Sequence, residues 1–367
     1  MWPIQVNTKK FENPDFVTTT PYMALCFYPE PKDISEFLLS VPNSQTVFLC
    51  DQNTHKHCFI PFFAPFFAHS HVIIIEPGES SKSIQQVEHI LDSLLAIHAD
   101  RDTLFVNLGG GVVTDLGGFC SAIFKRGIAC IHIPTSLMAM ADASIGGKTG
   151  VNLSQVKNAV GSFYSPKQVA ICSSFLRTLP QDEILSGWAE MVKMRLLFDP
   201  NALNVLQLTS EKKGYHLDDI APHITWSAQK KWEIVEQDPT EQQLRKVLNY
   251  GHTLGHAIES AALSQGINLS HGCAVGLGMQ LENDLALHKG MMQVYTHKAI
   301  QSVLKHYFPM PPDLVWDAHT LWEFMLNDKK NQAQQIRCVL ISEPGVFSLD
   351  VVVSRADIMY VIQSVMK

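Results

Sequence analysis

Two histidines four residues apart, in the stretch LNYGHTLGHAIE at 248–259, are the clearest candidates for chemistry in this sequence. Side chains at positions i and i+4 of a helix lie one above the other on the same face. At about 100° per residue, five polar side chains here fall within roughly 80° of arc, so the spacing predicts one polar stripe on one helix. The stripe comprises Arg245, Asn249, His252, His256 and Glu259. Because Gly251, Gly255 and Ala257 suit close packing, we expect the stripe to be buried, and buried polar groups need partners.

A divalent metal is one such partner for the histidines. Catalytic zinc takes three protein ligands, often neutral imidazoles, and keeps one open position. The metalloprotease signature is excluded, because it needs glutamate where this chain has Thr253. Further ligands are available from His271 in LSHGCAVGLGM and from Glu190 in GWAEMVKM, where Lys193 follows one turn later. The spacing does not decide which two of the three histidines bind a metal, and a pair of satisfied core histidines is the structural alternative.

Two glycine-rich segments could approach phosphate groups. In TLFVNLGGGVVTDLGGF, at 103–119, three glycines lie between a strand-like and a helix-like run, where bare backbone amides can approach a pyrophosphate. The usual dinucleotide fingerprint is not matched, because Thr114 stands at its third glycine. In DASIGGKTGVN a P-loop is excluded by Asp142, and the turn presents Asp142 and Lys148, which suit a hydroxyl and an anion. A tight turn and a salt-bridged surface turn are the respective structural alternatives.

The elements that must position these residues differ between the two halves of the chain. In the first half, short apolar runs alternate with helix-like segments, which predicts a doubly wound, mainly parallel sheet with ligands at the carboxyl ends of its strands. The runs lie at 46–50, 71–75, 103–108, 129–133 and 168–172. From Pro180 onward the periodicity is helical, with two late strand-like runs near 336–353. We therefore expect an α/β domain at 1–178 and a mainly α-helical domain at 179–367.

Composition limits the classes of function. A chain of 367 residues, 46% of them hydrophobic, can bury the cores of two domains. A net charge of −7 argues against nucleic-acid and anionic-membrane partners. The N-terminus lacks a signal-peptide pattern, and the sequence contains no run of about 18 apolar residues, the length needed to span a bilayer. The eight cysteines are scattered singly, which predicts reduced thiols and a cytoplasmic location.

Six motifs, in order along the chain, carry a resemblance to the 3-dehydroquinate synthase family of sugar-phosphate cyclases. They are GGGVVTD, IPTSLMAMADASIGGKTGVN, KNAVGSFYSP, GWAEMVK, LRKVLNYGHTLGHAIE and LSHGCAVGLGM. The resemblance implies an N-terminal Rossmann-like NAD-binding domain and a helical metal- and substrate-binding domain. It also implies a carbon–oxygen lyase acting on phosphates, which makes 3-dehydroquinate and phosphate from 3-deoxy-D-arabino-heptulosonate 7-phosphate in the shikimate pathway.

The same resemblance implies roles for individual residues. Metal ligands, for zinc or alternatively cobalt, fall on Glu190, His252 and His271, and His256 falls near the substrate phosphate. Contacts to substrate hydroxyls and carboxylate fall on Asp142, Lys193, Lys231, Arg245 and Asn249. Phosphate contacts fall on Lys148, Asn158 and either Lys329 or Lys330. Arg126 matches an arginine that enters the partner subunit's site, which implies a homodimer. Contacts to NAD fall on Asp51, Glu79, Lys82, Gly110, Gly111, Val112, Asp115, Thr135, Ser136, Lys148, Lys157, Phe175 and Thr178.

The implied reaction oxidises a ring hydroxyl transiently, eliminates phosphate, returns the hydride and closes a carbocycle by an aldol step. The chain departs from the family pattern at Cys273, where the family commonly has glutamate, and at Trp232 and Pro239 near Lys231. The alternatives are a sister cyclase of the valiolone, inosose or gadusol type, a metal-dependent polyol dehydrogenase and a non-catalytic binding protein. The cluster of anion-binding residues argues against the dehydrogenase, because a polyol carries no charge.

Overall fold

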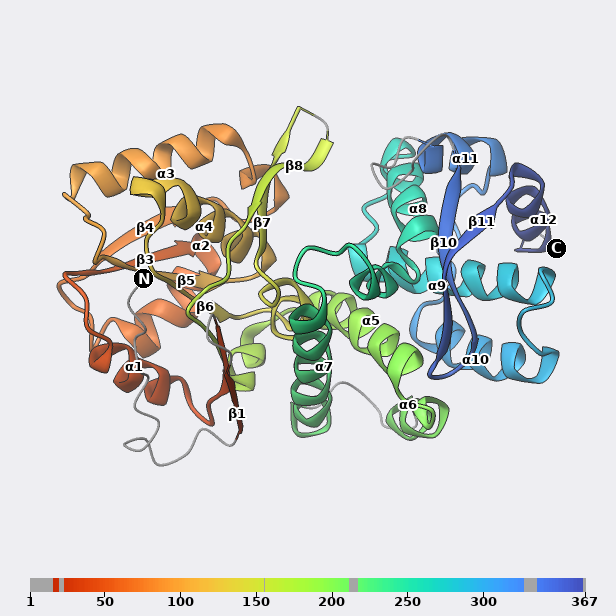
Figure 1. Cartoon of the computed structure of the whole chain (residues 1–367), viewed down its shortest axis with the longest axis horizontal. Coiled ribbons are helices and arrows are strands. Elements are labelled where there is room, and N and C mark those ends of the chain that lie inside the picture. Colours follow the sequence, from red (N-terminus) through yellow and green to blue (C-terminus); the bar gives the residue numbers. More distant parts are fainter. Residues whose placement is uncertain (1–15, 20–22, 155, 211–216, 327–334, 366–367) are drawn as a thin grey trace. The chain divides into compact units, whose positions relative to one another are not determined.

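The computed structural model describes residues 16–19, 23–154, 156–210, 217–326 and 335–365. Its contacts divide the chain into two compact units (Figure 1). The first unit contains the chain up to Pro180 together with Ile220–Val235, and the second contains Gln181–Asp219 and Glu236–Lys367. We expected 220–235 in the second domain, but by its contacts this helical segment groups with the first unit. A single boundary along the chain misses such a return, because sequence periodicity does not report which core a helix packs against.

The first unit is built on a seven-stranded sheet in the order β1-β2-β9-β6-β5-β3-β4. Neighbouring strands from β2 to β4 in that order are parallel, whereas β1 pairs with β2 in the antiparallel direction. The strands are β1 (Phe16–Thr19), β2 (Ala24–Phe27), β3 (Thr46–Asp51), β4 (His71–Ile75), β5 (Leu104–Gly109), β6 (Cys130–Pro134) and β9 (Gln168–Ile171). The predicted doubly wound, mainly parallel sheet is confirmed.

Other elements of this unit surround the sheet. They are α1 (Pro31–Ser40), α2 (Gln52–Thr54), η2 (His55–Phe63), η3 (Glu79–Ser81), α3 (Ile84–Ala96), α4 (Gly111–Ile123), η4 (Phe124–Arg126), η5 (Ala139–Ala143) and η6 (Ser173–Thr178). A separate antiparallel hairpin is formed by β7 (Lys148–Leu153) and β8 (Val156–Phe163). Most of the long helix α7 (Leu217–Gln237) groups with this unit.

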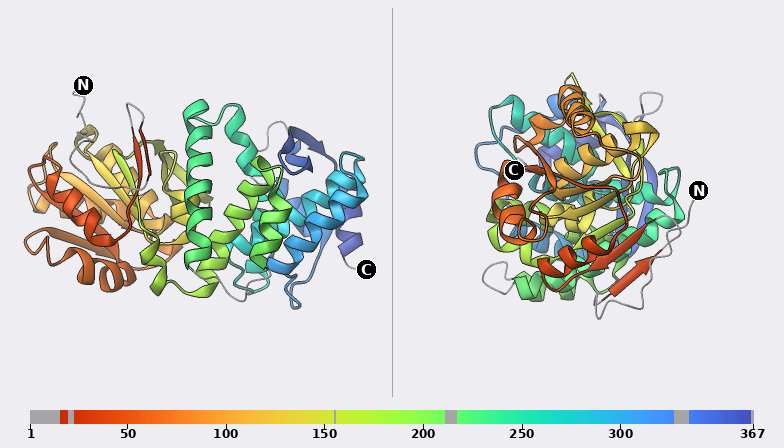
Figure 2. Two further views of the ribbon diagram at one scale, coloured as in Figure 1. Left: turned by 90° about the horizontal axis from the view of Figure 1, so that it is seen from below. Right: turned by 90° about the vertical axis from the view of Figure 1, so that its left-hand side faces the viewer.

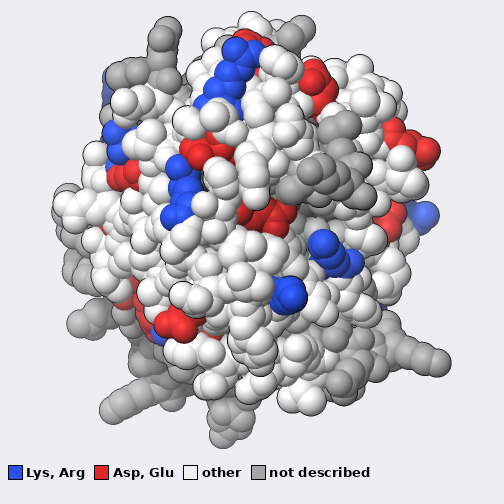
Figure 3. Space-filling model, turned by 90° about the vertical axis from the view of Figure 1, so that its right-hand side faces the viewer, with Lys and Arg blue, Asp and Glu red and all other residues white. Residues whose placement is uncertain are grey.

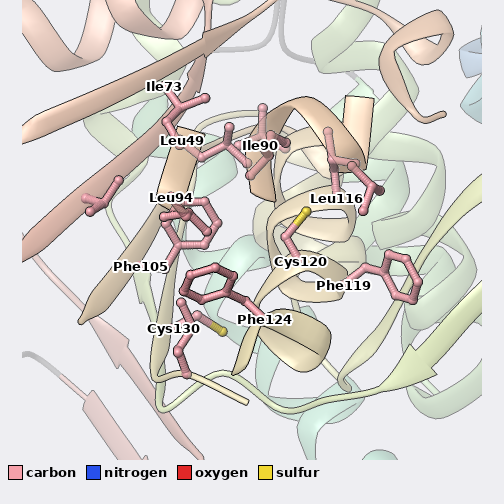
Figure 4. Close-up of a cluster of buried hydrophobic side chains, with 14 of the residues drawn as sticks. Leu49, Ile73, Ile90, Leu94, Phe105, Leu116, Phe119, Cys120, Phe124 and Cys130 are labelled. Carbon is pink, nitrogen blue, oxygen red and sulfur yellow. The ribbon is translucent and has the colours of Figure 1, made fainter. Parts of the chain in front are cut away.

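Both faces of the sheet are covered, as the alternation of side chains along β3 shows. Val47 and Leu49 are buried on one face in a cluster with residues of α3 and α4 (Figure 4). Phe48 points to the other face, where the centroid of its ring lies 5.0 Å from the ring centroid of Phe59 and 5.7 Å from that of Phe63, both in η2. Because successive strand residues face opposite sides, a strand buried on both faces is apolar throughout. This explains why the run at 46–50 lacks a polar alternation.

The order of the strands reverses between β3 and β5. From β3 the chain goes to β4 on one side and then crosses to β5 on the other side. In open α/β sheets, ligands bind at such a reversal, beyond the carboxyl ends of the strands. Asp51 ends β3 and Gly109 ends β5, so the residues that follow them stand at the expected binding edge.

The second unit is mainly helical, as predicted from Pro180 onward. Its elements are α5 (Gln181–Phe198), α6 (Ala202–Ser210), η7 (Leu244–Asn249), α8 (His252–Ser264), α9 (His271–His288), α10 (Val294–Tyr307), α11 (Ala318–Leu326), β10 (Ile336–Glu343), β11 (Val346–Val353) and α12 (Arg355–Val365). The predicted strand pair near 336–353 is confirmed as the antiparallel hairpin β10–β11. Helix α9 is buried along nearly its whole length and contacts α5, α8, α10, α12 and β10, so it forms the centre of this unit. Figure 2 shows the helices of this unit, in green to blue, from two further sides.

Backbone contact joins α8 to α9. A Cβ atom added at Gly278 of α9 would overlap the backbone of Gly251 and lie 2.6 Å from the amide nitrogen of Gly255. A Cβ at Gly255 would in turn lie 3.0 Å from the carbonyl oxygen of Ala274. The small residues noted in the sequence therefore allow the two helices to touch through their main chains.

All eight cysteines are free thiols, as predicted. Within the described ranges, none of the helices has the length and apolar character needed to cross a bilayer. Acidic and basic side chains are interspersed on the face drawn in Figure 3.

Replacement of Gly278 by alanine should destabilise the second unit. The added methyl group has no space between α8 and α9, and overpacking of this kind costs about 1–3 kcal/mol of unfolding free energy. Urea unfolding monitored by circular dichroism measures the loss. Ser302→Ala, at an exposed position of α10, is the control and should change stability little. Equal stability of Gly278→Ala and wild type would contradict the close helix contact.

Candidate active site

Glu190, His252 and His271 converge in the second unit from three different helices. One carboxylate oxygen of Glu190 on α5, Oε1, lies 3.4 Å from Nε2 of His252 and 3.7 Å from Nε2 of His271. The two histidines are the first residues of α8 and α9, respectively. Two imidazoles and a carboxylate are a donor set that divalent zinc accepts. The residues present therefore fit a metal ion.

His256 lies close to the same group. Ligand nitrogen atoms of His252, His256 and His271 all lie within 4.8 Å of one another. The ring centroids of His252 and His256 are 5.4 Å apart, one turn along α8. The structure thus brings together all three histidines that the sequence offered, and the geometry allows a set with Glu190 or a set of three histidines.

Glu190 is held as an anion in a buried position. Its side chain is 1% exposed and forms an ion pair with Lys193, whose side chain is 2% exposed. Nζ of Lys193 also donates to the carbonyl oxygen of Leu248 at 2.9 Å. Burial by itself raises the pKa of a carboxyl group, but the charges of Lys193 and His252 hold the pKa of Glu190 well below its ordinary value. A deprotonated carboxylate is the form that binds a metal.

The predicted stripe does not lie on one helix, and that expectation was wrong. Gly251 has φ = +79°, a left-handed conformation that interrupts the helical backbone between η7 and α8. Arg245 and Asn249 lie on η7, and only His252, His256 and Glu259 share α8. The left-handed turn at Gly251 suits glycine, because the Cβ atom of any other residue there would overlap Met279 of α9. Tertiary packing therefore interrupts a periodicity that the sequence carries without a break.

Arg245 and Asn249 have their own partners near η7. One guanidinium nitrogen of Arg245, Nη1, donates to the carbonyl oxygen of Pro239 at 2.7 Å. The side-chain amide of Asn249 donates to Glu241 at 3.1 Å. Asp238 accepts the backbone N–H of Arg245 at 3.0 Å, and its pKa is lowered because such N–H donors outweigh the opposing effect of burial. Hydrogen bonds thus fix the segment that precedes His252, the first candidate metal ligand of α8.

In the first unit, Lys82 joins three residues expected to bind cofactor or substrate. Its Nζ lies 2.7 Å from Oδ2 of Asp115 on α4 and 2.6 Å from Oδ1 of Asn158 on β8. Glu79 lies 3.9 Å from the same nitrogen. Burial raises the pKa of Asp115, while the Lys82 ammonium acts in the opposite direction. Asn158, expected at the phosphate, therefore groups with residues expected at the cofactor.

The glycine segment after β5 forms a bare backbone edge. Gly110 is the N-cap of α4, and Gly111 is its first residue. A Cβ added at Gly110 would lie 3.2 Å from Oγ of Ser136, and one at Gly111 would lie 3.3 Å from Cβ of Ala143. The amide groups of a helix N-terminus can bind a pyrophosphate when no side chain covers them. These residues fit a dinucleotide.

Asp142 and Lys231 form a second polar pair of the first unit. Nζ of Lys231 on α7 lies 2.8 Å from Oδ1 of Asp142 in η5 and also donates to the carbonyl oxygen of Asp142. Lys148 begins β7, five residues after η5 ends. The return of α7 to the first unit therefore places Lys231 beside a residue nearly ninety positions earlier in the sequence.

The remaining expected residues lie on several elements. Asp51 ends β3, Val112 is in the first turn of α4, and Thr135 and Ser136 directly follow β6. Lys157 is on β8, Phe175 and Thr178 are on η6, and Arg126 ends η4. Lys329 and Lys330 lie outside the described residues.

Glu282 is a site-supporting residue that sequence reasoning missed. Its side chain is fully buried within α9, and its Oε2 accepts the backbone N–H of Gly251 at 2.6 Å. A carboxylate at a helix N-terminus satisfies free amides and interacts favourably with the helix dipole. Glu282 thus fixes the turn that precedes His252. The available signal was an acidic residue inside the mostly apolar segment AVGLGMQLEN.

Comparisons with known proteins agree on one family. The 3-dehydroquinate synthase N-terminal family model matches residues 72–186, and the C-terminal model matches residues 187–331. A 3-dehydroquinate synthase of Parabacteroides distasonis is 39% identical over 332 residues, which cover 89% of this chain and 93% of that protein. One from Helicobacter pylori strain HPAG1 is 38% identical over 292 residues, 80% of this chain and 83% of that protein. The chain belongs to the 3-dehydroquinate synthase family.

Solved structures show that the fold of this 3-dehydroquinate synthase family member is shared more widely. A 2-deoxy-scyllo-inosose synthase complexed with carbaglucose-6-phosphate, NAD+ and Co2+ superposes with a TM-score of 0.80 at 24% identity, covering 93% of this chain and 96% of that one. A 2-epi-5-epi-valiolone synthase from Streptomyces hygroscopicus with NAD+ and Zn2+ gives a TM-score of 0.80 at 23% identity, with the same coverage. An NADH-dependent butanol dehydrogenase from Thermotoga maritima gives 0.64 at 14% identity, covering 95% and 98%. The fold by itself therefore does not separate cyclases from dehydrogenases.

The metal-free protein should lose stability as the pH rises, because of His271. Burial lowers the pKa of His271, but the hydrogen bonds that its ring donates to Glu190 and Glu259 raise it from 6.5 to about 9. A group whose pKa is raised by folding stabilises the protein fully below the unfolded pKa and loses that effect as pH rises through the folded one. With a chelator present to remove metal, the Tm of the wild type should fall relative to the Tm of His271→Gln as the pH rises from 6.5 to 9. Parallel pH profiles for the two proteins would contradict this assignment.

Proposed function

We propose that this protein is an active 3-dehydroquinate synthase, which converts 3-deoxy-D-arabino-heptulosonate 7-phosphate to 3-dehydroquinate and phosphate. The single observation that carries the proposal is the convergence of Glu190, His252 and His271 in a chain that belongs to this family. The first unit supplies the residues suited to a dinucleotide, and the second supplies the metal ligands. The enzyme class is a carbon–oxygen lyase acting on phosphates.

Glu190, His252 and His271 would hold a divalent metal, which we propose is zinc, with cobalt as the alternative. When bound, such an ion polarises a substrate hydroxyl and favours its oxidation. The ion pair with Lys193 keeps Glu190 deprotonated, and the main chain of Leu248 fixes the position of the Lys193 ammonium. His256, one turn along α8, is proposed to contact the substrate rather than the metal.

Gly110, Gly111 and Val112, at the start of α4, would hold the phosphates of NAD. When bound, NAD accepts and later returns a hydride, so the reaction involves no net oxidation. Further proposed contacts are Asp51, Glu79, Lys82, Asp115, Thr135, Ser136, Lys148, Lys157, Phe175 and Thr178. Asp51 lies at the end of β3 and Gly110 directly follows β5, where the strand order reverses, and this position supports the assignment.

Basic side chains would bind the two anionic groups of the substrate. In the second unit these are Lys193 and Arg245, with Asn249 for a hydroxyl group. In the first unit they are Lys148 and Lys231, with Asp142 and Asn158 as polar partners. Lysine and arginine are the side chains that hold phosphate and carboxylate by charge-assisted hydrogen bonds. A lysine from the pair Lys329 and Lys330 completes the proposed phosphate site.

We further propose a homodimer in which Arg126 serves the partner subunit. Helix α4 has 13 residues and therefore spans about 20 Å. Its start carries the glycine edge, and Arg126 lies beyond its opposite end, before β6 begins. This placement keeps Arg126 away from the glycine edge of its own chain and supports a role in another subunit. The eight free thiols support a reducing compartment, and we propose the cytoplasm.

The function is tested with the metal-loaded protein, NAD and the heptulosonate phosphate. Phosphate should be released continuously, one per substrate consumed, while NADH does not accumulate. Steady accumulation of NADH would indicate a dehydrogenase. Turnover of a heptulose 7-phosphate in place of the heptulosonate phosphate would indicate a sister cyclase.

The two histidines of α8 should respond differently to replacement. His252→Ala should lose both bound metal and activity, because it removes a ligand. His256→Ala should keep the metal and slow the reaction. Metal content by mass spectrometry and turnover together measure the difference. Equal loss of metal in both variants would favour the set of three histidines, whose nitrogen atoms lie within 4.8 Å of one another.

A further inference from the structure

His252 and His271 present equivalent ring nitrogens to Glu190. In each ring it is Nε2 that faces Oε1 of Glu190, at 3.4 Å for His252 and 3.7 Å for His271. An imidazole binds a metal through an unprotonated nitrogen, so the proton of each ring must then lie on Nδ1. What accepts that proton decides the tautomer and the orientation of the ring.

The two Nδ1 atoms have different acceptors. Nδ1 of His252 lies 3.2 Å from the carbonyl oxygen of Tyr250, two residues earlier in the chain. Nδ1 of His271 lies 3.4 Å from Oε2 of Glu259, which is on α8. His252 is therefore oriented by its own backbone, whereas His271 depends on a carboxylate from another helix.

Glu259 is placed for this contact by the helix register. It follows His252 by seven residues, or two turns, on the face of α8 that carries His256. Its side chain is 20% exposed, whereas that of His271 is 36% exposed. As the first residue of α9, His271 lacks a preceding helical turn to restrict its ring. A contact from α8 is then the means of fixing it.

We infer that Glu259 is a positioning residue for the metal site, which accepts the Nδ1 proton of His271 and directs its Nε2 toward the metal. This inference rests on the proposed function, because it takes His271 as a ligand. A carboxylate partner also makes the ring a stronger donor, and loss of such partners typically lowers metal affinity about 10- to 100-fold. Glu259 would act through His271 and is not one of the proposed metal ligands.

The test measures metal affinity in the full-length protein without substrate. Zn2+ binding to wild type, Glu259→Ala and Glu259→Gln is measured by competition with a chromophoric chelator. We expect about 10- to 100-fold weaker binding for Glu259→Ala and a smaller loss for Glu259→Gln, whose amide oxygen can still accept the proton. Glu323→Ala, which removes an exposed acid from α11 of the same unit, should bind as wild type does.

Two further measurements separate positioning from simple loss of folding. Urea unfolding of the metal-free variants should show a folded state that unfolds in a cooperative transition, lowered in Glu259→Ala only by the loss of the hydrogen bond to His271. Nitrogen NMR of the imidazoles in zinc-loaded protein should show His271 protonated at Nδ1 in wild type, with that signal altered in Glu259→Ala. Equal zinc affinity of wild type and a folded Glu259→Ala overturns the inference. Failure of wild type to bind zinc instead overturns the proposed metal set.

Discussion

The contact between the backbones of α8 and α9 is the constraint on which the candidate metal site depends. Gly251, Gly255 and Gly278 leave no room for a Cβ atom at the crossing, so the two helices approach as closely as their main chains allow. Both helices begin with a candidate ligand, His252 in one and His271 in the other. Close packing at the crossing therefore sets the spacing of the two imidazoles. Glycine carries a cost in helix propensity, which is offset here by the contact it allows.

Buried charge in the second unit is balanced by partners that lie close to it. Glu190 on α5 has Lys193 beside it, and Glu282 on α9 accepts amide protons from the turn before α8. An isolated carboxylate in such surroundings would take up a proton rather than remain charged. Each contact also fixes a backbone segment, since Lys193 reaches Leu248 and Glu282 reaches Gly251. The same charges that suit metal chemistry thus hold the turn that carries His252.

In the first unit, sheet topology and a buried lysine together position the candidate cofactor residues. The reversal of strand order between β3 and β5 leaves an edge at which Asp51 and the glycine segment both end strands. Lys82, 4% exposed, links Asp115 of α4 to Asn158 of the β7–β8 hairpin. The elements around this edge are therefore joined by side chains that the sequence alone also singled out.

The sequence by itself determined the fold class, the parallel strands, the late hairpin and the set of candidate ligands. Those features follow from local patterns: apolar runs of strand length, helical periodicity, and histidines and glycines at fixed spacings. The order of the six motifs along the chain also indicated the family. The sequence could also have drawn attention to Glu282, an acid that follows the apolar run AVGLGM, but it offered no sign of what that acid contacts.

Only the tertiary structure decided how the polar residues are shared among elements. The stripe from Arg245 to Glu259 is broken at Gly251, because the left-handed turn there is set by packing against α9. The segment 220–235 returns to the first unit and pairs Lys231 with Asp142. Glu259 meets His271 across two helices. Each of these depends on contacts between residues distant in sequence, and a helical or strand period carries information only about near neighbours.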